Sequence, residues 1–370
     1  MQKTPLYLNS LICQNQIGVQ EQKIGESFNS LDEYFLKSSS YRTHNSIVES
    51  LEKKIALLEQ TEDALAVVSL NIALSSIVYA LLQDGDHILV HETVSGELET
   101  WLYEFLPSVH VHVDRANFSN LTSIEENICK QTKMMLIEFP SIPFLEVFDL
   151  ESCIELAHKK NILCVVNHTM LSPVSIQPSK YGADIVISSL KEYYACGKNI
   201  GAYFASNKML LLQIRRIVQL LDVSLPEKEA ICILDHLQTL AVRIEKISKN
   251  ASIVVNFLQS HPRIETMYYI DATYPNVQKQ LTYTGGICYC KLKTNQAGTL
   301  QFLNRLKHCS IQTMFGGLQT TLEYPTAMSY LLIPTKKQTK LGIEDNLVRI
   351  SVGLEQIEDI LRDIDQALLG

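Results

Sequence analysis

The chain has 370 residues, of which 46% are hydrophobic and 19% are charged. That composition is typical of a folded globular protein rather than a disordered one, and the length favours two domains. A formal net charge of −8 argues against nucleic acid and anionic membranes as main partners.

The cysteines and the first residues of the chain indicate the cellular compartment of the protein. Nine cysteines are scattered along the sequence, an odd number, and no pair has CxxC spacing. Such free thiols are typical of a reducing environment, and residues 1–15 lack the charged and apolar regions of an export signal. We therefore expect a cytoplasmic protein. Because neither CxxC nor HExxH occurs, we also expect no metal site.

Apolar residues alternate between strand-like and helix-like spacing up to about residue 190. Residues 1–45 are polar and are expected to form an N-terminal arm, whereas Ile47, Leu51 and Ile55 mark one face of a helix over 46–60. Strands are predicted at 63–68, 87–91, 109–113, 134–139, 162–166 and 184–187, with helices at 74–83, 124–130 and 150–159. This alternation predicts a mostly parallel, doubly wound α/β sheet.

The most apolar stretch, residues 64–82, is not expected to cross a membrane. It contains the polar residues Ser69, Asn71, Ser75 and Ser76. A short strand followed by a helix accounts for it better than a continuous apolar span. We therefore expect no membrane partner.

The pattern changes in the last third of the chain. After Leu225-Pro226, one long helix is predicted from 230 to about 259, followed by a strand at 287–292 and a helix at 298–307. A strand at 347–352 and a helix at 356–369 end the chain. The expected division is an arm (1–45), a large α/β domain (46–245) and a smaller C-terminal α+β domain (246–370).

Lys191 is the leading candidate for a functional residue. It follows the apolar run Ile185–Ile187, which reads as a buried parallel strand. Ligands of such sheets bind beyond the carboxyl ends of the strands, where a lysine amine would be available for nucleophilic attack. The alternative is an ordinary surface lysine just past a strand.

Seven segments of the chain, in collinear order, match the motifs of one family. They are Arg42–Asn45 with Leu51-Glu52, Ala64–Ala66 with Ser69, Glu138–Pro143, Val165–Thr169 with Ser172-Pro173, Gly182–Lys191, Leu237–Leu240 with Arg243, and Arg349–Glu355. Together they resemble the Cys/Met-metabolism family of pyridoxal-phosphate enzymes, the cystathionine synthases and lyases of fold type I. The resemblance covers roughly residues 40 to 370. The resemblance therefore implies a large domain of the fold type I transferase kind with a smaller C-terminal domain.

The resemblance also implies roles for individual residues. Lys191 would hold pyridoxal 5'-phosphate (PLP) as a Schiff base, Arg42 would reach the cofactor phosphate of a neighbouring subunit, and Arg349 would bind the substrate α-carboxylate. Guanidinium groups clamp phosphate and carboxylate in this way. A contribution from another chain would make a homodimer or homotetramer obligatory. The remaining positions expected at the site are Ser69, Asn71, Ser95, Asn167 and Ser188 for the cofactor and Glu138 for the substrate.

Several positions depart from the family pattern. Asn167 replaces the aspartate that pairs with the ring nitrogen, and a neutral amide cannot hold that nitrogen protonated by charge. Ser95 stands where the family has a ring-stacking tyrosine. The phosphate cradle reads Leu70-Asn71, where a glycine would permit closer backbone approach.

Two functions are consistent with this sequence. The first is a divergent PLP-dependent lyase or transferase of trans-sulfuration, which catalyses elimination or replacement at the β or γ carbon of a sulfur-containing or related amino acid. The second is a catalytically degenerate homologue with an assembly or partner-binding role, paired with an active paralogue. Retention of Lys191 and Arg349 favours the first, whereas Asn167, Ser95 and Leu70 favour the second.

Overall fold

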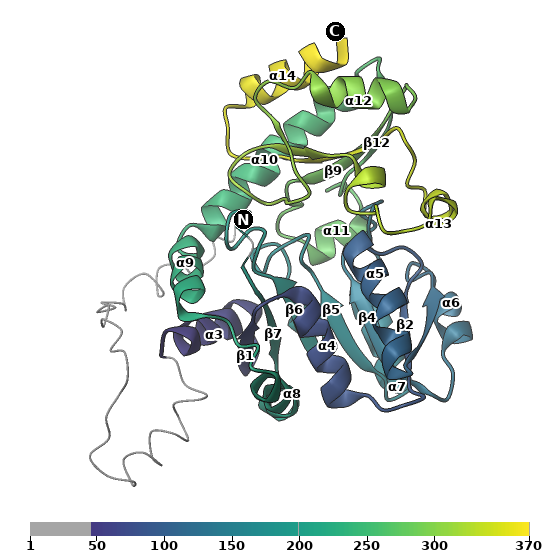
Figure 1. The fold of residues 1–370 in the computed structure, drawn as a ribbon, viewed down its shortest axis with the longest axis vertical. Coiled ribbons are helices and arrows are strands. Elements are labelled where there is room, and N and C mark those ends of the chain that lie inside the picture. Colours follow the sequence, from purple (N-terminus) through teal and green to yellow (C-terminus); the bar gives the residue numbers. More distant parts are fainter. Residues whose placement is uncertain (1–45, 199, 370) are drawn as a thin grey trace.

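The structure, a computed structural model, describes residues 46–198 and 200–369. It contains two sheets, and Figure 1 shows the C-terminal sheet above the large one. The large sheet has seven strands in the order β1 (Asp63–Val67), β7 (Ala202–Ser206), β6 (Ile185–Ser189), β5 (Leu163–Asn167), β4 (Thr132–Glu138), β2 (His87–His91) and β3 (His112–Ala116).

The large sheet is mostly parallel, as the sequence predicts. The strands β6, β5, β4, β2 and β3 pair in parallel, whereas β7 is antiparallel to both of its neighbours, β6 and β1. All five residues of β7 are buried. The sequence analysis did not predict β7, although it did predict the two strands between which β7 lies. Because the carboxyl ends of the parallel strands meet at one edge, the residues that follow them converge there.

Helices cover both faces of the large sheet, because successive strand residues point to opposite sides. In β2, Ile88 and Val90 pack into one apolar cluster and Leu89 packs into the other. The first cluster includes helices α4 (Leu70–Leu81), α5 (Gly96–Glu104) and α8 (Lys208–Leu221). The second includes α3 (Ser46–Glu59), α6 (Leu121–Asn127), α7 (Leu150–Lys159) and α9 (Glu227–Leu237).

The C-terminal sheet has five strands and its own apolar cluster. Their order is β10 (Ser310–Ile311), β11 (Thr321–Glu323), β12 (Leu347–Ser351), β9 (Ile287–Leu292) and β8 (Ile264–Tyr268). Helices α10 (Leu240–Gln259), α12 (Gln296–Asn304) and α14 (Ile357–Leu369) pack in this cluster. Figure 1 shows α10 leading from the large part of the molecule to this sheet.

A segment of the C-terminal part reaches back onto helix α5. Lys337 of α13 (Thr335–Lys340) pairs with the buried carboxylate of Glu99, and the Tyr330 hydroxyl donates to the Val94 carbonyl at 2.9 Å. A Cβ at Gly96 would lie 2.0 Å from the Ser329 carbonyl oxygen, so glycine is required for this approach. The segment therefore joins the two sheets beside the carboxyl edge of the large one.

Several predicted elements differ from the structure in their bounds, and two of them show the cause. The helix predicted from 230 to about 259 is divided, because α9 ends at Leu237 and α10 begins at Leu240. The strand predicted at 109–113 begins only at His112, since Leu106–Val109 forms a 3-10 turn and His110 has a φ of 54°. The spacing of apolar residues indicates which face of an element is buried. It does not reveal a turn after which the same face stays buried.

Candidate active site

A cavity of about 500 Å³ lies between the two sheets, at the carboxyl edge of the large one. The large-sheet side contributes residues that follow β4, β5 and β6, and the C-terminal side contributes residues of β9 and β12. Six of the residues predicted from the sequence line this cavity: Asn71, Ser95, Glu138, Asn167, Lys191 and Arg349.

Lys191 lies two residues beyond the end of β6, with its side chain 27% exposed. Its ammonium nitrogen is 3.6 Å from Oε1 of Glu192, whose side chain is 5% exposed. Burial raises the pKa of the Glu192 carboxyl, and the Lys191 charge opposes that effect. The cavity thus holds one accessible amine next to a buried acid, which is a suitable arrangement for covalent attachment and proton transfer.

Glu138, at the end of β4, is a buried acid fixed by Ser95. The Ser95 backbone N–H donates to Oε2 at 2.6 Å and the Ser95 hydroxyl donates to Oε1 at 2.8 Å. Burial raises the pKa of the Glu138 carboxyl to about 7, and the two bonds from Ser95 lower it in part. Ser95 also caps helix α5, because its hydroxyl accepts from the Leu98 N–H.

Asn167, at the end of β5, has a fixed amide orientation. Its Oδ1 accepts from the Thr169 backbone N–H at 3.1 Å and from the Thr169 hydroxyl at 2.6 Å. A backbone N–H can only donate, so the atom that faces it must be the amide oxygen. The amide nitrogen therefore points the other way, toward Glu138 Oε1 at 3.4 Å, and presents a donor at the cavity.

Arg349, in β12, is buried and already has an acidic partner. Its Nη1 lies 2.5 Å from Oε2 of Glu323, and Nη2 donates to the Thr313 carbonyl at 2.6 Å. The guanidinium also lies over the Phe315 ring, 5.1 Å from its centroid. Glu323 was not identified from the sequence. Its position opposite Arg349 follows from the antiparallel register of β11 and β12.

The residues at the cavity fit the cofactor that the resemblance implies. Helix α4 begins at the cavity with Leu70 and Asn71, whose backbone N–H groups donate to no other group within residues 46–198 and 200–369. A helix start with free N–H groups binds phosphate. Lys191 supplies the amine, and Asn167 supplies a donor for a ring nitrogen. PLP would thus be held by α4 at one end and by Lys191 at the other.

Two predicted cofactor residues of the described part of the chain, Ser188 and Ser69, do not line the cavity. The Ser188 side chain is fully buried in β6 and donates to the Ser189 carbonyl at 3.3 Å. Ser69 caps α4 by accepting from the Ile72 N–H. Arg42 lies outside the described residues. The roles predicted for these three residues stay predictions. Ser69 caps the start of α4, the helix whose first N–H groups lie at the cavity.

Other residues of the cavity were not singled out from the sequence. Several are acidic or aromatic and come from segments without a recognisable motif. They are Glu97, Glu104, Thr313, Phe315 and Tyr289. Glu97 and Glu104 lie on α5, a helix that the sequence analysis did not predict, so their position at the cavity had no sequence signal.

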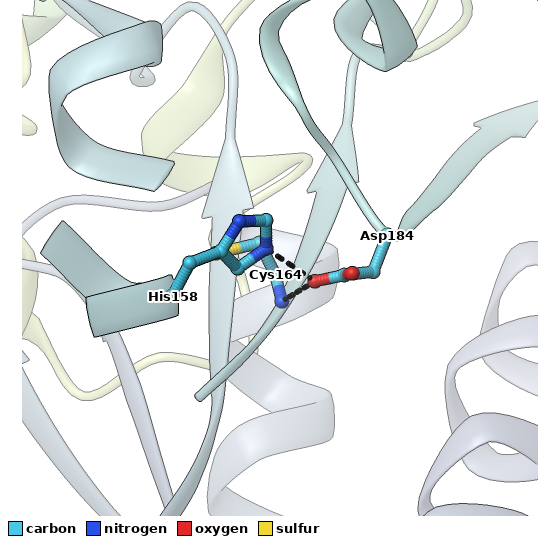
Figure 2. Close-up of side chains that lie close together, drawn as sticks. All are labelled: His158, Cys164 and Asp184. Carbon is cyan, nitrogen blue, oxygen red and sulfur yellow. Dashed lines mark hydrogen bonds and ion pairs between the residues drawn. The ribbon is translucent and has the colours of Figure 1, made fainter. Parts of the chain in front are cut away.

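A second cluster lies outside the cavity, between α7 and the starts of β5 and β6. Figure 2 shows His158, Cys164 and Asp184, whose potential ligand atoms lie within 4.8 Å of one another. Asp184 Oδ2 is 2.9 Å from His158 Nε2 and accepts from the Cys164 backbone N–H at 2.7 Å. Burial raises the pKa of the Cys164 thiol far above its usual range, which disfavours the thiolate that binds metals. The cluster therefore acts as a hydrogen-bonded link between these elements.

None of the described helices combines the length and the apolar character needed to span a membrane.

Comparison with known proteins agrees with the resemblance. The sequence model of the Cys/Met metabolism PLP-dependent enzymes matches residues 4–369. The L-methionine gamma-lyase of Fusobacterium nucleatum subsp. polymorphum is 34% identical over 336 residues, which cover 88% of this chain and 85% of the lyase. The cystathionine beta-lyase of Coxiella burnetii is 29% identical over 374 residues, which cover 99% of this chain and 92% of that protein.

Solved structures give the same result for the fold. The cystathionine gamma synthase of Xanthomonas oryzae pv. oryzae, solved with aminoacrylate and cysteine, superposes with a TM-score of 0.85 at 26% identity. The match covers 89% of this chain and 86% of the synthase. The predicted fold class, a fold type I large domain with a smaller C-terminal domain, is confirmed.

Proposed function

The chain belongs to the Cys/Met metabolism family of PLP-dependent enzymes, and on that premise we propose that it catalyses elimination or replacement at the β or γ carbon of a sulfur-containing or related amino acid. The observation that supports this most is the convergence of Lys191, Asn167, Glu138 and Arg349 on one cavity. Relatives named as lyases and synthases provide no support for the degenerate alternative.

We propose the following roles for the cavity residues. Bound PLP supplies an electron-withdrawing ring that stabilises negative charge on a substrate carbon. Lys191 would hold the cofactor through its amine and, as a free amine, would move protons at its Nζ. Asn167 would offer its amide N–H to a ring nitrogen, and Asn71 with the start of α4, capped by Ser69, would hold the phosphate.

The remaining roles concern the substrate and the closure of the site. Glu138, held by Ser95, faces the substrate as a buried acid with a pKa of about 7, so it can carry a proton near neutral pH. Arg349 is the cationic group on the substrate side. The segment that places Tyr330 against Val94 restricts water at the cavity. Ser188 would support the end of β6, and Arg42 would reach the phosphate of a neighbouring subunit in a homodimer or homotetramer.

Turnover of sulfur amino acids tests this function. The purified protein, supplied with PLP, is incubated with L-methionine, L-cystathionine and L-cysteine, and thiol and keto-acid release are measured. We expect release from at least one of them, reduced at least about 10²-fold in Lys191→Ala, because the attaching amine is lost. Equal release by the wild type and Lys191→Ala, or none by either, would contradict the proposal.

A further inference from the structure

A second hollow, of about 490 Å³, lies at the amino edge of the large sheet, opposite the edge that carries Lys191. Its lining includes His87, His112 and Asp114. His87 and His112 are the first residues of β2 and β3, and they pair in register. Because successive strand residues alternate between faces, Asp114 lies on the same face of β3 as His112. The parallel register therefore brings three potential metal ligands to one place, although no motif in the sequence links them.

The His87 imidazole has a fixed tautomer. Its Nδ1 lies 2.7 Å from Oγ1 of Thr132. The Thr132 hydroxyl has a single proton, which it donates to Sγ of Cys129 at 3.4 Å, so its oxygen accepts from the Nδ1–H of His87. The lone pair of the imidazole is therefore on Nε2. Histidines that bind metals have this arrangement, in which the other ring nitrogen donates to the protein.

Nε2 of His87 faces the carboxylate of Asp114. The His87 side chain is 3% exposed, and its Nε2 has no hydrogen-bond partner among the described residues, although Oδ2 of Asp114 lies 3.3 Å away. Two atoms that can only accept repel each other at this distance unless a cation lies between them. Two ligand atoms of a tetrahedral zinc ion, each about 2.0–2.1 Å from the metal, are about 3.3–3.4 Å apart. The spacing therefore fits a bound zinc ion.

His112 can supply a third ligand. Its side chain is exposed and lines the same hollow, so the imidazole can turn toward His87 and Asp114. Burial lowers the pKa of the His87 imidazole, the carboxylate of Asp114 opposes this effect, and the charge of His112 adds to it. His87 is thus neutral near neutral pH, which is the form of imidazole that binds metals.

We propose that His87, Asp114 and His112 bind a zinc ion, with water as the fourth ligand. Two imidazole nitrogens and a carboxylate favour Zn²⁺, whereas Mg²⁺ prefers oxygen ligands in an octahedral arrangement. β3 is the edge strand of the large sheet, and the ion would join its first residues to β2. The site would be structural, because it lies at the opposite edge from the cavity of Lys191. The inference is independent of the proposed function.

Zinc titration tests the site. The full protein is freed of metal with a chelator and titrated with Zn²⁺ or Mg²⁺ by calorimetry. We expect the wild type to bind one zinc ion per chain at this site, in the micromolar range or more tightly, and Mg²⁺ not to replace it. Asp114→Asn and His112→Asn change exposed side chains, and each is expected to weaken zinc binding at least about tenfold, because a ligand is lost.

Two variants are matched controls. His110→Asn removes a neighbouring exposed imidazole outside the hollow, and asparagine tolerates the φ of 54° at that position. Cys129→Ser removes the exposed thiol of the hollow and keeps an acceptor for Thr132. Both are expected to bind zinc as the wild type does. Absence of zinc binding in the wild type, undiminished binding in Asp114→Asn and His112→Asn, or its loss in either control would overturn the inference.

Hydrogen exchange locates the ion by a readout other than affinity. Zn²⁺ is expected to slow the exchange of backbone amides in β3 of the wild type, because the ion holds the edge strand against β2. The same addition should leave exchange in Asp114→Asn unchanged. Slower exchange in another part of the chain but not in β3 would place the ion elsewhere and overturn the inference.

Discussion

Asn167 is the residue at which this site departs most from its family in chemistry. Thr169 donates to the amide oxygen from both its backbone and its hydroxyl, so the amide nitrogen faces Glu138 and the cavity. A donor at that place pairs with an unprotonated ring nitrogen, which is a weaker electron sink than a protonated one. We infer that a cofactor ring bound here withdraws electrons less strongly than it would beside an aspartate.

Replacing Asn167 by aspartate tests this inference. The Thr169 donors would still hold one carboxylate oxygen, and the other would supply the charge that protonates a ring nitrogen. We expect the visible absorbance of the bound cofactor to change and the rate of elimination to rise by about 10²-fold, since one preorganised group of this kind contributes about 10²–10³. Absorbance spectra and initial rates measure both effects.

Asn71→Asp is the control for that variant, because it adds the same charge to the same cavity at the helix start. We expect it to weaken PLP binding without changing the absorbance maximum of the bound fraction. An Asn167→Asp protein that binds PLP with an unchanged spectrum and unchanged rate would show that the ring nitrogen does not depend on residue 167.

For individual residues, sequence motifs predicted much of the candidate site. Lys191, Asn167 and Glu138 end or follow strands of the doubly wound sheet, whose carboxyl ends converge, so they meet at the cavity. Arg349 joins them from β12 of the C-terminal sheet, and the family resemblance rather than the strand pattern pointed to it. Glu323 could not be predicted in the same way. Its contact with Arg349 depends on the pairing of β11 with β12, and β11 is too short to leave an alternating pattern.

Among the elements, helix α3 is joined to the large sheet through a buried acid. Oε1 of Glu52 accepts from the Ala66 backbone N–H of β1 at 2.9 Å, and Arg215 of α8 lies 3.9 Å from Oε2. Burial raises the pKa of the Glu52 carboxyl from 4.5 to about 7, although the Ala66 bond and Arg215 oppose this. The folded chain therefore keeps a proton that the unfolded chain releases.

This contact predicts a pH-dependent stability. Protonated Glu52 contributes to the free energy of unfolding, and this contribution is fully present below pH 4.5. It is lost as the pH rises through about 7, because the unfolded state then binds fewer protons than the folded state. Glu52→Gln keeps the acceptor for Ala66 and removes the ionisation. Between pH 5 and pH 8, we expect the free energy of unfolding of the variant to rise by about 2 kcal/mol relative to that of the wild type. Denaturant unfolding at the two pH values measures this difference.

Glu126→Gln, an exposed substitution on α6, is the control and should show no such gain. A Glu52→Gln variant whose stability difference from the wild type is the same at pH 5 and pH 8 would contradict the buried, protonated state of this carboxyl.

The elements themselves were predicted well where burial repeats regularly. The helix predicted at 150–159 is α7 (Leu150–Lys159), and the strand predicted at 87–91 is β2 (His87–His91). The break between α9 and α10 at Gln238-Thr239 was missed because buried residues continue on both sides of it, from Leu237 to Leu240. An apolar pattern does not reveal such a turn.

For the whole molecule, the site requires both parts of the chain. Lys191 comes from the large sheet and Arg349 from the C-terminal sheet, and the cavity lies between them. The predicted boundary between 245 and 246 lies within α10 (Leu240–Gln259) and stays a prediction. The assembly of subunits stays a prediction as well, since it depends on Arg42, which lies outside the described residues.

Mixed subunits test that assembly. If Arg42 of one subunit serves Lys191 of another, Arg42→Ala and Lys191→Ala proteins are each nearly inactive, and unfolding and refolding them together regenerates one intact site in each mixed dimer. Random pairing then gives about a quarter of the wild-type activity. Activity of the mixture that equals the average of the two separate proteins would contradict a site shared between subunits.

The central claim is that this chain attaches PLP through Lys191 in the cavity between its two sheets. Borohydride reduction of the PLP-containing protein, followed by peptide mapping with mass spectrometry, tests it most directly. We predict one modified peptide with the reduced cofactor on Lys191, and no modified peptide from Lys191→Ala. Labelling of another lysine, or equal labelling of the wild type and Lys191→Ala, would contradict the account.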